Sequence, residues 1–181
     1  MNIILTGSSG LLGQNLLNKI SKLYKIYDIS RKNSKYNVDL SNFINLKNLF
    51  LDIKPDLIIN LAANTNLDEI ENKTDLGLIS NYTIVQNIVE YIKINDNTIK
   101  LIHLSTDNFY DEKFLNTESD IKILNNYALS KYLSELACLD VKSLILRTNF
   151  FGKSIGSKKS FSDKIIETIS SGKEIDLFHD V

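Results

Sequence analysis

Residues 2–13 read Asn2-Ile3-Ile4-Leu5-Thr6-Gly7-Ser8-Ser9-Gly10-Leu11-Leu12-Gly13. The apolar run before Gly7 predicts a short strand, and the helical spacing of the apolar residues that follow predicts a helix through Leu16, Leu17, Ile20 and Leu23. Gly7 permits a tight turn, Gly10 lets a pyrophosphate approach the backbone, and Gly13 lets the helix pack close to the strand. The helix start offers free N–H groups and a favourable dipole to the phosphates. The stretch therefore predicts a dinucleotide-binding loop. The alternative is a glycine turn without a ligand, and the spacing differs from the usual G-x-G-x-x-G fingerprint, which indicates a particular subgroup.

The end of the next apolar run, 25–29, bears on which dinucleotide is bound. An acidic residue at the end of this strand suits the ribose 2′-hydroxyl of NAD, whereas an arginine there suits the 2′-phosphate of NADP. Ser30 and Arg31 follow the run, and Asp28 lies two residues before Ser30. If the strand ends at Ile29, Arg31 favours NADP(H), which we expect; an earlier end would favour NAD(H) through Asp28, and Arg31 could also be a solvated loop residue.

The rest of the chain alternates apolar strands with amphipathic helices. Strands are expected at 57–61, 99–104 and 141–147, and a further one starts at 174–178. Helices are expected from Ser41 as N-cap to Ile53, where Pro55 ends the helix, and at 76–94, 126–139 and 158–171. This alternation predicts an α/β fold, a Rossmann-like doubly wound parallel sheet with helices on both faces. On the third helix, Asn81 is expected to tie neighbouring loops together.

Polar and small residues follow several of these strands at their carboxyl ends. Ala62 and Ala63 come after the run 57–61 and would let a flat cofactor lie against the backbone, or would serve close packing alone. Ser105, Thr106 and Asp107 end the next run, where an open α/β sheet places its chemistry; the alternative is a Ser/Thr/Asp turn.

Tyr127 and Lys131 are four residues apart on the predicted helix that begins near Asn125 or Asn126. That spacing puts both side chains on one face, one turn apart. A phenol has a pKa near ~10, and a nearby ammonium lowers it, so the pair could transfer a proton near neutral pH. Taken alone, the spacing is also that of an ordinary amphipathic helix.

Composition excludes several classes of protein. The chain has 181 residues, of which 43% are hydrophobic and 24% charged, and its net charge is −1, so it shows no basic surface for nucleic acid or membranes. Cys138 is the single cysteine and is expected to be a small buried residue, and the two histidines are far apart, so no metal site is predicted. No signal peptide and no membrane-spanning run is visible, and the default location is the cytoplasm.

Six motifs together resemble one family, the extended short-chain dehydrogenases/reductases. They are Thr6–Gly13, Asp39-Leu40, Asn60-Leu61-Ala62-Ala63, Leu104-Ser105-Thr106-Asp107, Tyr127-Ala128-Leu129-Ser130-Lys131 and Arg147-Thr148-Asn149. Within that family the chain is most similar to the dTDP-4-dehydrorhamnose reductases and related sugar-nucleotide reductases, through the stretches 54–60 and 64–71.

The resemblance implies a role for each matching residue. Tyr127 would protonate the carbonyl oxygen of a nucleotide-linked 4-dehydro-6-deoxy sugar, Lys131 would lower the Tyr127 pKa and bind the nicotinamide ribose, and Thr106 would polarise the same carbonyl. Asp39 could accept a hydrogen bond from the adenine amino group or simply flank a helix. The cofactor-binding residues implied are Gly7, Ser9, Gly10, Leu11, Leu12, Gly13, Ser30, Arg31, Asp39, Leu40, Leu61, Ala62, Ala63, Ser105, Tyr127 and Lys131.

The resemblance also implies a domain organisation and leaves alternatives. Residues 1–152 would form the NAD(P)-binding domain, and 153–181 would begin a substrate-binding region whose larger part is missing. An epimerase or dehydratase of the same fold, or a non-catalytic NAD(P)-binding regulatory subunit, are the other readings. Asn108 after Asp107 favours the reductase, because dehydratases of this group usually carry Asp-Glu there. The oligomeric state stays open, a homodimer included.

Overall fold

The computed structural model of the chain describes residues 1–110, 115–155 and 159–174. The chain forms two compact units, Met1–Asn149 and Phe150–Val181. The first contains the whole sheet and every residue singled out above for catalysis or cofactor binding.

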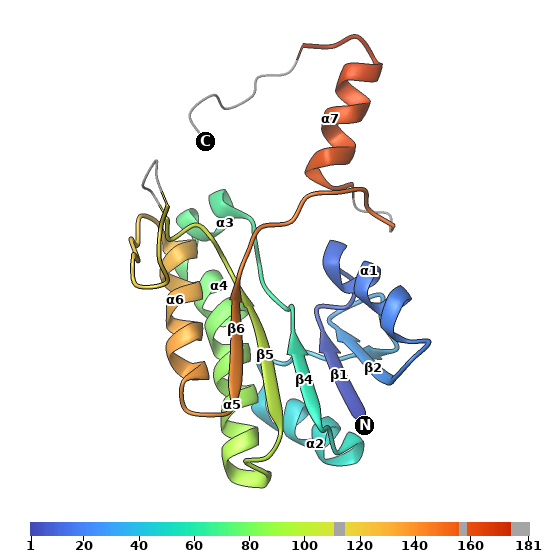
Figure 1. The fold of residues 1–181 in the computed structure, drawn as a ribbon, viewed down its shortest axis with the longest axis vertical. Helices are drawn as coiled ribbons and strands as arrows, with labels where there is room; N and C mark the ends of the chain where they lie inside the picture. Colours follow the sequence, from blue (N-terminus) through green and yellow to red (C-terminus); the bar gives the residue numbers. More distant parts are fainter. Residues whose placement is uncertain (111–114, 156–158, 175–181) are drawn as a thin grey trace. The chain divides into compact units, whose positions relative to one another are not determined.

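Six parallel strands make one sheet in the order β3-β2-β1-β4-β5-β6 (Figure 1). They are β1 (Asn2–Thr6), β2 (Lys25–Ser30), β3 (Tyr36–Asn37), β4 (Leu57–Asn60), β5 (Lys100–Ser105) and β6 (Ser143–Arg147). The order reverses at β1, which pairs with β2 on one side and β4 on the other. This is the arrangement of a doubly wound dinucleotide-binding sheet, so the predicted fold class is confirmed.

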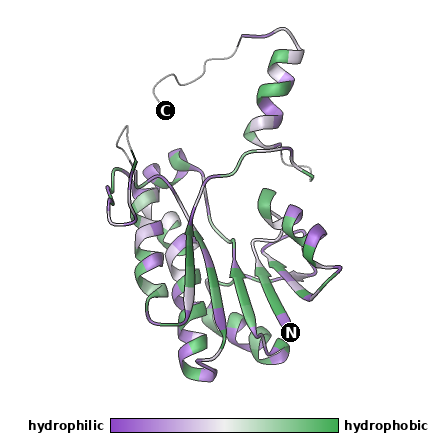
Figure 2. Cartoon of the chain, viewed as in Figure 1, coloured by the Kyte–Doolittle hydropathy of each residue, from purple (hydrophilic) through white to green (hydrophobic). Residues whose placement is uncertain are grey.

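Helices cover both faces of this sheet. On one face, α1 (Leu11–Ile20) packs its apolar side on Ile3, Leu5 and Ile59. On the other, α2 (Phe43–Ile53), α5 (Ile84–Asn95) and α6 (Asn126–Cys138) enclose the larger core, with Ile4, Ile58 and Leu101 from the strands. Figure 2 shows the strands as mostly hydrophobic and the helices as mixed, as expected for strands covered on both faces. Cys138 is buried in the larger core, as predicted.

The helix expected over 76–94 is not one regular element. It consists of α4 (Thr74–Gly77), the π-helix η1 (Leu78–Thr83) and α5. A short helix before it, α3 (Leu67–Asn72), was not predicted. Single π-helical turns inside α-helices occur frequently at functional sites, and here the π-helix carries Asn81.

Asparagine side chains cap the N-termini of α2, α3 and α6. Asn42 caps α2 by accepting from the Asn45 N–H at 3.1 Å, so the expectation of Ser41 as the cap was wrong by one residue. Asn125 caps α6 by accepting from the Ala128 N–H at 2.7 Å, which fixes where the helix with Tyr127 begins.

The second unit contains α7 (Phe161–Ser170), which begins at a capping box made by Ser160 and Asp163. The helix predicted for 158–171 is therefore confirmed in its central part. The strand start predicted for 174–178 lies outside the described residues except for Glu174, which has no regular structure. Within the described ranges, no helix is long and apolar enough to cross a membrane.

Candidate cofactor and catalytic site

The glycine loop lies against the segment that follows β4, at the point where the strand order reverses. The backbone N–H of Leu61 donates to the Thr6 carbonyl, and the Ala62 N–H donates to the Thr6 hydroxyl, both at 3.3 Å. A Cβ on Gly7 would lie 2.6 Å from the Leu61 carbonyl carbon, and Gly7 has a φ of +65°. Only glycine therefore fits here, and the structure brings Gly7, Leu61 and Ala62 together.

The same loop also closes onto its own helix. A Cβ on Gly13 would lie 2.4 Å from the Gly7 carbonyl oxygen, so α1 packs directly on the turn. Gly10 is exposed, and a Cβ there would meet only the Gly7 carbonyl, at 3.2 Å. The Ser8 hydroxyl is buried and has no hydrogen-bond partner among the described residues, although the prediction named Ser9 rather than Ser8. An open glycine, an unpaired hydroxyl and the start of a helix fit a phosphate-bearing dinucleotide.

Strand β2 ends at Ser30, one residue later than expected, and Arg31 is the exposed residue that follows it. The Asp28 carboxylate accepts a hydrogen bond from the Lys35 N–H at 2.9 Å and so holds the loop after the strand. The Ser30 hydroxyl donates to the Lys32 carbonyl at 2.5 Å. Arg31 thus follows the end of β2 with an exposed side chain, whereas Asp28 lies within the strand and is bound to the loop.

Asp39 and Leu40 have partners within the chain. The Asp39 carboxylate accepts from the Ser41 N–H and hydroxyl, at 3.0 and 2.8 Å, and its residue is exposed. The Leu40 side chain is part of the larger core, and its carbonyl accepts from the Asn87 amide at 3.0 Å. Of this pair, the exposed Asp39 is therefore the one whose side chain can reach a ligand.

Thr106 lies at the carboxyl end of β5 with its hydroxyl oxygen already in use as an acceptor. It accepts from the Asn108 N–H at 3.1 Å and from the Asn108 side-chain amide at 3.0 Å. Its hydroxyl also lies close enough to the Tyr127 hydroxyl to lower the pKa of that phenol. The neighbouring Ser105 hydroxyl is buried without a partner among the described residues. Thr106 and Tyr127, which belong to two separate motifs, are thus adjacent.

Tyr127 is 7% exposed, and this burial raises its pKa above the ordinary value for a phenol. The hydrogen bond with Thr106 acts in the opposite direction but does not outweigh burial. The expectation of a Tyr127 pKa below the ordinary value for a phenol was therefore wrong. The physical reason is that removing a phenolate from water costs more than the nearby groups return.

Lys131 is 2% exposed and donates from Nζ to the Leu104 carbonyl at 2.6 Å. Burial lowers the pKa of Lys131 to about 8, although the Glu135 carboxylate, one turn further along the helix, acts to raise it. A lysine ammonium has three N–H donors. This contact therefore turns the ammonium toward β5 and uses one donor.

Asn81 on the π-helix ties the segment after β4 to the catalytic helix, as predicted for this residue. Its amide oxygen accepts from the Asn64 N–H at 2.7 Å, and its amide nitrogen donates to the Asn64 carbonyl and to the Ser130 hydroxyl. Ser130 donates in turn to the Tyr127 carbonyl at 2.7 Å. The backbone of Tyr127 is thereby linked to the segment that follows β4.

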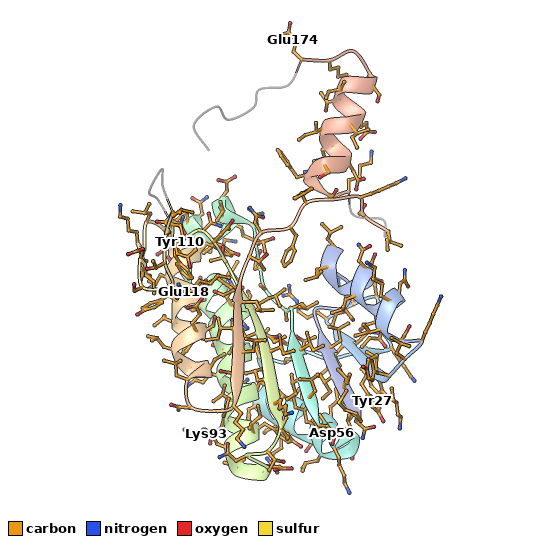
Figure 3. All side chains as sticks on the ribbon, in the orientation of Figure 1. Tyr27, Asp56, Lys93, Tyr110, Glu118 and Glu174 are labelled. Carbon is orange, nitrogen blue, oxygen red and sulfur yellow. The ribbon has the colours of Figure 1, made fainter. Side chains whose placement is uncertain are left out.

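A buried ion pair beside this site was not predicted. Arg147 of β6 donates from Nη2 to the Glu135 carboxylate at 2.7 Å, and from Nη1 to the Tyr110 hydroxyl and the Glu118 carbonyl. Figure 3 shows Tyr110 and Glu118 together, both from the segment between β5 and α6. These residues also line a cavity of about 550 Å³, whose lining does not include Thr106, Tyr127 or Lys131. Arg147 stands in one of the motif stretches, but its pairing with Glu135 depends on the α6–β6 packing.

A family model described as the RmlD substrate binding domain matches residues 1–181. The chain belongs to this RmlD family. Its relatives include the dTDP-4-dehydrorhamnose reductase of Shigella flexneri, 27% identical over 186 residues that cover 99% of this chain and 60% of that protein. The resemblance inferred from the motifs is confirmed.

Two solved structures show the same fold. A hypothetical dTDP-4-dehydrorhamnose reductase from Sulfolobus tokodaii superposes with a TM-score of 0.86 at 32% identity, over 97% of this chain and 64% of that one. A dTDP-4-dehydrorhamnose reductase from Bacillus anthracis in complex with NADP has a TM-score of 0.82 at 25% identity, over 96% of this chain and 61% of that one. The chain thus spans just over 60% of the length of these RmlD relatives.

Proposed function

We propose that this chain is the cofactor-binding and proton-donating part of an NADPH-dependent reductase that acts on the 4-keto group of a nucleotide-linked 6-deoxy sugar. The observation that carries the proposal is the Tyr127 hydroxyl, buried against the Thr106 hydroxyl at the carboxyl end of β5, with the Lys131 ammonium one helical turn away. The named activities of the RmlD relatives supply the substrate class.

The residues at the strand-order reversal fit the cofactor. The backbone from Gly7 to Gly13 would hold the pyrophosphate, Ala62 and Ala63 would lie along the dinucleotide, and Arg31 would bind the 2′-phosphate of NADP. When bound, the nicotinamide supplies a hydride to the carbonyl carbon of the sugar.

Tyr127 supplies the proton in this proposal. Because burial raises its pKa, the phenol stays protonated at neutral pH and can donate to the oxygen as negative charge develops there. The Thr106 oxygen accepts two hydrogen bonds from Asn108, which leaves its proton for the Tyr127 hydroxyl or for the substrate oxygen. The Lys131 ammonium then stabilises the phenolate that Tyr127 leaves behind.

A comparison of two tyrosine variants tests this role. Tyr127→Phe removes the proposed acid. Tyr132→Phe removes a hydroxyl from another tyrosine of the same helix, whose ring packs edge-on against that of Phe109 with 6.2 Å between the ring centroids. With dTDP-4-dehydrorhamnose and NADPH, we expect Tyr127→Phe to lower kcat by about 10²- to 10⁴-fold without changing NADPH affinity. Tyr132→Phe should keep the wild-type rate.

Two results would contradict the proposal. One is wild-type turnover by Tyr127→Phe. The other is a folded chain that binds NADPH but reduces no nucleotide-linked keto sugar, which would favour a non-catalytic binding role.

A further inference from the structure

A continuous line of buried polar side chains crosses the sheet beneath the candidate site. It runs through Thr6 on β1, Asn60 on β4, His103 on β5 and Ser134 on α6, and each of these residues is 0% exposed. The Thr6 hydroxyl donates to Asn60 Oδ1 at 2.5 Å, Asn60 Nδ2 lies 3.0 Å from His103 Nδ1, and His103 Nε2 lies 2.9 Å from the Ser134 hydroxyl. Register explains the line, because Thr6 is opposite Asn60 and Asn60 is opposite His103.

Only one protonation state of His103 fits these contacts. The Asn60 amide nitrogen can only donate, so Nδ1 must accept. The Ser134 hydroxyl spends its single proton on the Lys131 carbonyl, at 2.6 Å, so it must accept from the N–H on Nε2. His103 is therefore neutral with its proton on Nε2, and burial followed by the Lys131 charge holds its pKa well below the usual range. Every donor in the line then meets an acceptor.

The two ends of the line reach the two halves of the proposed site. At one end, Thr6 directly precedes Gly7 and its hydroxyl accepts the Ala62 N–H, so it joins the glycine loop to the segment after β4. At the other end, Lys131 is linked to β5 directly through its ammonium and indirectly through Ser134 of its own helix. Its Nζ donates to the Leu104 carbonyl, and its main-chain carbonyl is bound by Ser134, which His103 orients.

We propose that His103 and Ser134 are positioning residues for Lys131, and that they fix its ammonium relative to the crevice formed by the glycine loop. The role of Lys131 in reduction rests on the proposed function, whereas the fixed position of its ammonium does not. Loss of the Ser134 hydroxyl frees one of the two attachments of Lys131 to β5. The ammonium then gains access to water, and its pKa moves toward the ordinary value of 10.5.

Charged and titratable groups near Lys131 also influence the pKa of its ammonium. On its own helix they are Glu135 and Cys138, and on β5 the group is His103. Arg147 of β6 pairs with Glu135 and keeps that carboxylate in place. A change at Ser134 alters none of these charges, so a shift of the Lys131 pKa reports a change of position.

The test compares three serine variants of the whole chain. Ser134→Ala removes the hydroxyl, and Ser134→Thr keeps one at the same place. Ser143→Ala is the matched control, because the Ser143 hydroxyl also donates to an α6 carbonyl, that of Cys138 at 2.7 Å, but at the far end of the helix. Thermal melts of all three establish that they are folded.

Lysine Cε chemical shifts in the ¹³C-labelled chain, followed against pH, report each lysine pKa. In wild type we expect one lysine to titrate near the value of about 8 that burial gives Lys131. In Ser134→Ala that titration should move upward by about one pH unit, a tenfold change in proton affinity. Ser134→Thr and Ser143→Ala should titrate as wild type does. An unchanged Lys131 titration in folded Ser134→Ala would overturn the proposal.

NADPH titration of the same variants separates this proposal from the proposed function. If wild type binds NADPH and the Lys131 pKa is unchanged in Ser134→Ala, the positioning role is wrong and the cofactor claim stands. If the Lys131 pKa shifts in Ser134→Ala but the chain binds no NADPH, the positioning role stands and the cofactor claim is wrong. Weaker NADPH binding by Ser134→Ala together with the shift would support both.

Discussion

Gly13→Ala tests whether the turn between β1 and α1 is the cofactor cradle. The added Cβ would lie 2.4 Å from the Gly7 carbonyl oxygen and 2.7 Å from Ser8 Cα, where ordinary contact begins at 3.4 Å. Both neighbours are backbone atoms, so the turn itself has to move by about 1 Å. Overpacking of this kind costs about 1–3 kcal/mol, and alanine returns about 1 kcal/mol over glycine in a helix. The net loss of up to about 2 kcal/mol leaves a typical domain folded.

A shift of about 1 Å in the turn should affect the ligand far more than the fold. We expect NADPH affinity, measured by nicotinamide fluorescence, to fall about 10- to 100-fold in Gly13→Ala. The matched control is Gly77→Ala, another buried helical glycine, where the new Cβ would meet the Cγ2 methyl of the buried Ile70 side chain at 2.7 Å rather than backbone. It should bind NADPH as wild type does. If folded Gly13→Ala binds NADPH with wild-type affinity, the turn does not hold the pyrophosphate.

Three further predictions concern single side chains. Arg31→Ala should lower NADPH affinity by about tenfold and leave NADH affinity unchanged. Lys32→Ala, which removes the neighbouring exposed cation, is the control. Equal losses for both cofactors would refute recognition of the 2′-phosphate by Arg31. Arg147→Met leaves a buried carboxylate unpaired, so urea unfolding should show a loss of about 3–5 kcal/mol, while Lys93→Met, at an exposed ion pair of 2.9 Å, should show no measurable change. The pKa of His103 is depressed in the folded chain, so unfolding takes up a proton below about pH 6.5. The free energy of unfolding should therefore fall by up to about 1.4 kcal/mol per pH unit as pH decreases. A His103→Gln variant whose stability has the same pH slope as wild type would contradict this.

Local patterns were sufficient to predict most of the fold. The spacing of Gly7, Gly10 and Gly13 between an apolar run and an amphipathic helix has one common structural solution, and the structure adopts it. Apolar runs likewise identified β1, β2, β4, β5 and β6, because parallel strands covered on both faces are mostly apolar. The pair Tyr127 and Lys131 was located for a similar reason, since helical spacing alone places both on one face.

Other features depend on signals that are weak or that lie far apart in the sequence. The short helix α3 has little apolar periodicity, but Asn66 followed three residues later by Glu69 is a capping signal that could have indicated it. The raised pKa of Tyr127 depends on its burial, which spacing does not reveal. The contact of Asn60 with His103 and of Glu135 with Arg147 follows from strand register and helix packing, which a single sequence does not specify.

The most direct test of the whole account is a titration of the purified 181-residue chain with NADPH and with NADH, followed by nicotinamide fluorescence. We expect saturable binding of NADPH, tighter than that of NADH, because Arg31 and not Asp28 follows the end of β2. A chain that circular dichroism shows to be folded but that binds neither cofactor would contradict the central claim, and tighter binding of NADH would contradict the role of Arg31.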